Sequence, residues 1–162
     1  MGLSDWYKRL RHSRGYGVHS PYAFSMVLET LHAPRGCCYY AEEAIADPHL
    51  RLIFRIIVAL QPSDIIVTAN PERTVLIQEI ARHALPHCKP DSALAPHTLV
   101  IAEGPMPDAP AAGASILTDT PTDPALLRHI AAHPYGHLYA NPRRALFAAL
   151  PHLPSQTIRV NF

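Results

Sequence analysis

The stretch that decides the fold runs from residue 64 to residue 84, Asp64-Ile65-Ile66-Val67-Thr68-Ala69-Asn70-Pro71-Glu72-Arg73-Thr74-Val75-Leu76-Ile77-Gln78-Glu79-Ile80-Ala81-Arg82-His83-Ala84. Its first part, 64–69, is a continuous apolar run of strand length, typical of a strand buried on both faces. Its second part, 72–84, carries apolar side chains at helical spacing, which predicts a helix. The turn between them contains no glycine, although glycines at such a turn let the backbone approach a bound cofactor. The scaffold of an α/β unit is predicted, but its usual cofactor-binding turn is missing.

Strands and helices alternate through the rest of the chain. Further strands are predicted at 97–103, 114–118, 136–140 and 157–162, and further helices at 123–130 and 142–150. This alternation predicts a Rossmann-like α/β fold with a mostly parallel sheet of about five strands. We expect 64–69 to be central in the sheet and 97–103 to lie beside it.

The segment before this core reads as helical. Helices are expected at about 5–13, 20–31 and 47–60, with a loop at 33–40. Two of them begin at a capping residue followed by proline, at Ser20-Pro21 and Asp47-Pro48, which favours a helix start. We predict one domain over 1–162, divided into a helical segment, 1–62, and a Rossmann-like core, 63–162.

Composition excludes several classes of protein. Of 162 residues, 48% are hydrophobic and 17% charged, which indicates a globular chain. Lys and Arg number 14 against 13 acids, so no global charge favours nucleic acid or a membrane surface. No apolar stretch is long enough to span a bilayer, and charges interrupt residues 1–16 where a signal-peptide core would lie. The three cysteines suit neither a disulfide framework nor a zinc site, and we expect a cytoplasmic protein with reduced thiols.

Several motifs in the first part of the chain agree with one known family. They are Tyr16-Gly17-Val18-His19-Ser20-Pro21-Tyr22, Tyr39-Tyr40-Ala41-Glu42-Glu43-Ala44-Ile45, Leu52-Ile53-Phe54-Arg55 and Gln61-Pro62. In order and spacing these resemble a bacterial family of class I SAM-dependent methyltransferases with a Gly-Val-His-Ser-Pro motif. The resemblance covers roughly residues 1–67.

The resemblance implies that SAM would lie over the carboxyl ends of the first strands. It also implies an acid after the second strand to hold the ribose hydroxyls, and Glu103 stands at that position. The positions that the resemblance nominates for cofactor binding are Thr68, Ala69, Asn70, Glu103, Gly104 and Asn141. It names no catalytic residue and no metal ligand in this chain.

The departures from the family are equally informative. The glycine-rich turn is replaced by residues 68–72, the acid-containing end of the fourth strand is replaced by Asn141-Pro142, and only Asn161-Phe162 stands where paired acids usually follow the fifth strand. We therefore expect a shortened, degenerate relative whose SAM site is weakened or lost, and which binds a protein partner or a small molecule. Two alternatives stay open: an active methyltransferase with an atypical cofactor loop, and a purely structural or interaction domain, for example a homodimer.

Two further patterns bear on function. His129, His133 and His137 recur every four residues, as ligands on one helix face would. However, Pro134 breaks the helix before His137 and no acid completes a set, so we predict no metal site. The last strand, 157–162, alternates apolar and polar residues, and its outer edge should need a cover.

Overall fold

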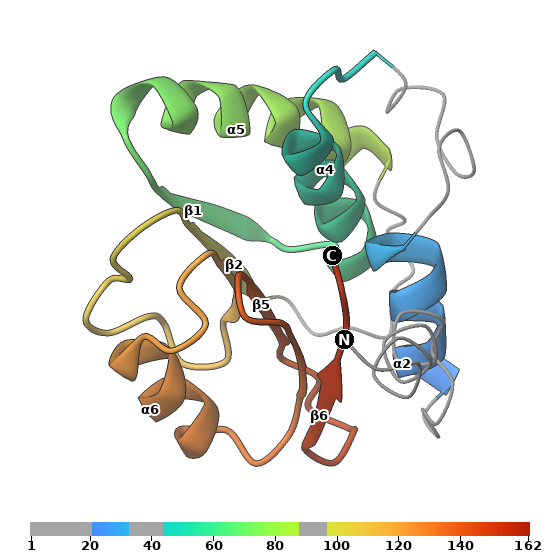
Figure 1. Ribbon diagram of the computed structural model, residues 1–162, viewed down its shortest axis with the longest axis vertical. Helices are drawn as coiled ribbons and strands as arrows, with labels where there is room; N and C mark the ends of the chain where they lie inside the picture. The colour runs from blue at the N-terminus through green and yellow to red at the C-terminus, as the bar shows by residue number, and fades with distance from the viewer. Residues whose placement is uncertain (1–20, 33–43, 88–96) are drawn as a thin grey trace, which may run out of the picture.

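The computed structural model describes residues 21–32, 44–87 and 97–162 (Figure 1). The predicted helix at 5–13, the loop at 33–40, the cysteines and most of two resemblance motifs, at 16–20 and 39–43, lie outside these ranges. In the part of the chain described, no helix has the length and apolar character needed to cross a membrane.

The described residues form one six-stranded mixed sheet with the order β1-β2-β3-β5-β4-β6. The strands are β1 (Asp64–Thr68), β2 (Thr98–Ala102), β3 (Ser115–Thr118), β4 (His137–Ala140), β5 (Ala145–Ala148) and β6 (Gln156–Arg159). β1, β2 and β3 are parallel neighbours, and β4 is parallel to β6. β5 lies antiparallel between β3 and β4. The prediction of an α/β fold is confirmed, with one more strand than expected.

The helices lie largely where the sequence predicts them. They are α2 (Pro21–Ser25) with the π-helical turn η1 (Met26–Leu31), α4 (Pro48–Leu60), α5 (Pro71–Ala84) with the 3-10 turn η2 (Leu85–His87), and α6 (Pro124–Ala132). α4, α5 and α6 each begin with proline directly after a capping side chain: Asp47, Asn70 and Asp123. These caps explain the helix starts, because a side-chain oxygen accepts a backbone N–H that has no partner inside the helix.

Two hydrophobic clusters cover the two faces of the sheet. One joins α2, η1, α4 and α5 to strand residues such as Leu99 and Ile101. The other joins α6 to Val100, Ile116 and Phe147. Successive residues of β2 thus point to opposite faces, as a strand between two helical layers requires. Figure 1 shows α4 and α5 on one side of the sheet and α6 on the other.

The prediction that 64–69 is a central strand buried on both faces is wrong. β1 is the outer strand of the sheet and has β2 as its partner, as predicted. Ile65 and Val67 pack against the cluster that contains α4 and α5. Ile66 points to the other face, where the cluster under α6 contains no β1 residue, and its exposed fraction is 43%.

The prediction of a helix at 142–150 is also wrong, because Ala145–Ala148 forms strand β5. All four of its residues are buried, since neighbouring strands flank it and both faces of the sheet are covered. A short apolar run of this kind suits a buried helix and a buried strand equally. Its partners in the sheet therefore decide its conformation.

The last predicted strand exists and forms the second outer strand, β6. Ile158 and Val160 are buried, while Arg159 and Asn161 are exposed, in agreement with the predicted alternation. The cluster that buries the two apolar residues also contains Ala23 of α2. The apolar side of β6 is therefore covered by the helical layer that includes the N-terminal helices.

Candidate functional site

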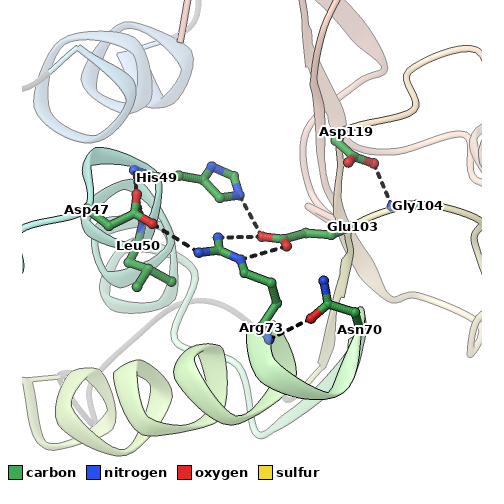
Figure 2. A network of polar contacts seen from close by, with 8 residues as sticks. All are labelled: Asp47, His49, Leu50, Asn70, Arg73, Glu103, Gly104 and Asp119. Carbon is green, nitrogen blue, oxygen red and sulfur yellow. Dashed lines mark hydrogen bonds and ion pairs between the residues drawn. The ribbon is translucent and has the colours of Figure 1, made fainter.

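A cluster of charged side chains lies at the carboxyl end of β2, where the first turns of α4 and α5 meet the sheet (Figure 2). We call Asp47, His49, Arg73 and Glu103 the Arg73 cluster. Carboxyl ends of parallel strands are where α/β proteins usually bind ligands. The cluster therefore occupies the place where the family resemblance implies a cofactor.

Asp47 and Arg73 are positioned by the starts of their helices. One carboxylate oxygen of Asp47 accepts the backbone N–H of His49 at 2.7 Å and so caps α4. The side chain of Asn70 caps α5 by accepting the backbone N–H of Arg73 at 2.9 Å. These two caps place the Asp47 carboxylate and the Arg73 guanidinium within reach of each other, at 3.0 Å.

Glu103 is held by Arg73 through two parallel hydrogen bonds. The Arg73 Nε–H donates to Glu103 Oε2 at 2.9 Å, and the Nη2–H donates to Oε1 at 2.7 Å. The ring nitrogen Nε2 of His49 lies 3.1 Å from the same Oε1. Paired contacts of this geometry are the strongest that arginine makes with a carboxylate. The two Glu103 oxygens are thus both engaged within the protein.

The electrostatics of the cluster keep its acids ionised. Hydrogen bonds from Arg73 lower the pKa of Glu103 and outweigh the opposing effect of partial burial. Burial raises the pKa of Asp47, but hydrogen bonds from Arg73 and from the first turn of α4 outweigh this effect and leave the pKa below its usual value.

Burial, reinforced by the nearby charge of Arg144, lowers the pKa of His49 against the opposing effect of Glu103 and so favours the neutral ring. An ionised carboxylate only accepts hydrogen bonds, so the neutral His49 ring donates from Nε2 to Glu103. The Nδ1 atom of His49 is then an acceptor, and it is buried without a hydrogen-bond partner. With two carboxylates against one guanidinium, the cluster carries one net negative charge.

The turn at 68–70, which the resemblance nominates for cofactor binding, is also bonded internally. The carbonyl of Thr68 accepts the backbone N–H of Glu103 at 2.8 Å. The carbonyl of Ala69 accepts the Thr74 hydroxyl at 3.3 Å, and the Asn70 side chain serves as the helix cap. Thr68, Ala69, Asn70 and Glu103 are thus brought together, but by bonds to one another and to α5.

Gly104 lies beside this turn, and its backbone N–H donates to the carboxylate of Asp119 at 2.8 Å (Figure 2). Its φ of 101° lies in the region that favours glycine, so the turn needs this residue for its conformation. Asp119 follows β3 at the same edge of the sheet and is not among the site residues predicted from the sequence. The pattern of an acid directly after a predicted strand could have identified it.

Asn141 is not part of this group. In the strand order β4 stands three positions from β2, which separates the two strand ends by about 14 Å at ordinary strand spacing. The Asn141 side-chain oxygen accepts the backbone N–H of Arg143 and of Arg144, and its amide donates to the carbonyl of Phe162. Asn141 therefore closes the turn between β4 and β5.

The three regularly spaced histidines are divided between the two faces of the sheet. The rings of His129 and His133 lie tilted against each other with centroids 4.2 Å apart, and both contact Phe147 under α6. His137 is buried in β4 and its Nδ1 lies 3.2 Å from the Tyr139 hydroxyl on the opposite face. Within the described ranges, no group of three or more potential ligands could hold a metal ion.

The partners of Glu103 are not apparent from the sequence. Arg73 lies in the first turn of α5 and His49 in the first turn of α4, 30 and 54 positions before Glu103 in the chain. Neither spacing forms a local motif, and the contact requires β1 and β2 to be neighbours. Comparisons with protein-family models, curated proteins and solved structures find no match to this chain.

Proposed function

We propose that this chain is a methyltransferase-like α/β domain that does not use SAM and that acts by binding a partner. One observation carries the first part of the proposal: both carboxylate oxygens of Glu103 are hydrogen-bonded to Arg73. Glu103 is the residue that the family resemblance nominates to hold the ribose hydroxyls.

Binding a ribose at Glu103 would require Arg73 to leave. Neutral hydroxyls form weaker hydrogen bonds to a carboxylate than a guanidinium does. The displaced Arg73 would also lose its contact with Asp47 at 3.0 Å or be left with that single partner. The exchange therefore costs free energy, and SAM binding is disfavoured by the chain's own side chains.

The other nominated groups support the same conclusion. The Asn70 side chain, the Gly104 N–H and the Asn141 side chain each have a partner within the protein. A ligand that displaced them would leave a helix cap or a turn without its hydrogen bond, which typically costs about 1 kcal/mol each. Cofactor sites usually present such groups free and pre-oriented.

Thermal unfolding with and without SAM, or its demethylated product, tests the proposal. A ligand present at 100 times its dissociation constant raises the free energy of unfolding by about 2.7 kcal/mol, which is a readily measured shift in melting temperature. We expect no shift with either compound. A shift with both that disappears in Glu103→Ala would instead support the alternative of an active methyltransferase with an atypical loop.

The alternative of a structural or interaction domain shares its main expectation with the proposal, since both require binding surfaces outside the Arg73 cluster. The outer strand β1 provides one, because it has a described partner on one side only. A protein that neither binds SAM nor transfers methyl groups but self-associates would fit both.

A further inference from the structure

The outer edge of β1 has a defined pattern of backbone groups. The backbone N–H of Glu103 donates to the carbonyl of Thr68, so Thr68 faces β2. Backbone groups of successive strand residues face opposite edges, so those of Ile65 and Val67 face outward. In the described part of the chain, no strand pairs with this outer edge.

β1 lacks the features by which outer strands usually avoid pairing. Such strands carry lysines, prolines or bulges, or are very short. β1 runs for five regular residues, and its one charged residue, Asp64, stands at its beginning. β6, the opposite outer strand, ends in the exposed Arg159. The two edges of the sheet thus differ in their resistance to pairing.

We propose that β1 pairs antiparallel with β1 of a second copy, about a two-fold axis at Ile66. In this register Ile65 faces Val67 of the second copy, and the two outward-facing residues of each strand exchange hydrogen bonds. Ile66 faces its own counterpart at a position without hydrogen bonds, where side chains lie closest. The exposed side of Ile66 is buried by this contact.

The sequence of β1 favours this register. Apolar residues face apolar residues, and Asp64 faces Thr68, so no like charges oppose each other. A shift of the axis by one residue toward Asp64 would place Asp64 opposite Ile66. A shift in the other direction would place Ile66 opposite Thr68. The axis at Ile66 therefore gives the best-matched pairs.

The two-fold axis also limits the assembly to two copies. Each copy uses the same edge, so the pairing consumes both β1 edges and leaves β6 as the outer strand at each end of the described sheet. The proposal is independent of the methyltransferase resemblance.

Light scattering on the full chain across a range of concentrations tests the proposal. We expect the wild type to approach twice the protomer mass, and Ile66→Lys to remain at the mass of one protomer because two like charges would face each other across the axis. Leu127→Lys is the matched control, since Leu127 is 52% exposed on α6. It should behave as the wild type. A wild type that is monomeric throughout, or an Ile66→Lys variant that still dimerises, would overturn the proposal.

A cross-linking experiment covers the case in which Ile66→Lys fails to fold. In a background without the three native cysteines, Ile66→Cys places two thiols at a position where opposite Cα atoms lie about 4.5 Å apart, within disulfide range. Mild oxidation should give a covalent dimer from Ile66→Cys and none from Leu127→Cys. Equal cross-linking of the two variants, or none in either, would contradict the proposed axis.

Discussion

The Arg73 cluster and the outer edge of β1 are adjacent regions that differ in what they leave unpaired. In the cluster, both oxygens of Glu103 and both carboxylate oxygens of Asp47 have partners inside the protein. At the edge, the outward backbone groups of Ile65 and Val67 have none among the described strands. The Arg73 cluster has the charged residues that are typical of a binding site. It nevertheless has fewer free hydrogen-bonding groups for a ligand than the apolar strand beside it.

The chemical type of a residue therefore does not by itself identify a site. Glu103 stands where the resemblance expects a cofactor-binding acid, yet Arg73 meets its hydrogen-bonding needs. A binding group must be accessible and unsatisfied before the ligand arrives, because otherwise the ligand has to replace an existing contact. By this criterion β1 is the better candidate surface.

Of the substitutions that we propose, Arg73→Met should have the largest effect on the free energy of unfolding. This change leaves Glu103, whose side chain is 18% exposed, without its main partner. For a pair buried to this degree we expect a loss of about 2 kcal/mol in the free energy of unfolding, between the values for surface and fully buried pairs. Urea denaturation measures it. Arg128→Met, at an exposed arginine on α6, should change stability by less than about 0.5 kcal/mol.

Adding Glu103→Met to Arg73→Met should restore part of the lost stability, because the unpaired carboxylate is then removed as well. The double-mutant cycle gives the coupling between the two side chains directly. If Arg73→Met changes the free energy of unfolding as little as Arg128→Met does, the pair of Arg73 and Glu103 does not stabilise the fold. The Arg73 cluster would then differ from the edge of β1 less than we infer.

A second, smaller effect concerns pH. Because the native pKa values of Glu103 and Asp47 lie below their unfolded values, these groups contribute stability that is present above about pH 4. The contribution is lost as the pH falls through the lowered native pKa values. Glu103→Gln should therefore flatten the decline in stability below about pH 4, measured by urea denaturation at several pH values.

An unchanged acid profile in Glu103→Gln would mean that Glu103 has the same pKa in the folded and unfolded chain. That result is incompatible with the two hydrogen bonds from Arg73. The inference that Arg73 already satisfies the Glu103 carboxylate would then lose its electrostatic support.

The sequence predicts which segments form helices and strands better than it predicts which strands are neighbours in the sheet. α4, α5 and α6 carry caps and prolines that mark their starts, and β1 to β3 are short apolar runs between turns, so local patterns sufficed for them. The strand order follows from pairing between distant segments, which no local pattern encodes. For this reason β1 was expected in the centre of the sheet, although it lies at the edge.

The errors at β5 and in the site have the same origin. Ala145–Ala148 contains residues that suit a helix, and only its place between β3 and β4 makes it a strand. The family resemblance nominates Glu103 because it follows the second predicted strand. Its partner Arg73 is not nominated, because that contact depends on β1 and β2 being neighbours and on where α5 begins.

The smallest effect that we expect is at the edge. Ile66→Thr keeps a β-branched side chain in the strand and, at protein concentrations too low for association, should change the free energy of unfolding by less than about 0.5 kcal/mol. Ile116→Thr on β3 is the control. Ile116 is fully buried, so an added hydroxyl there should cost about 2 kcal/mol or more. Equal losses in the two variants, measured by urea denaturation, would show that Ile66 belongs to the core of the protomer.

Isothermal titration calorimetry of the wild type with SAM measures whether Glu103 can bind the cofactor while Arg73 is present. Arg73 already forms hydrogen bonds to both oxygens of Glu103, the carboxylate that the cofactor would need. We predict no measurable heat of binding for SAM or its demethylated product. A micromolar dissociation constant in the wild type that is lost in Glu103→Ala would contradict the account, because Glu103 would then bind the cofactor despite its contacts with Arg73.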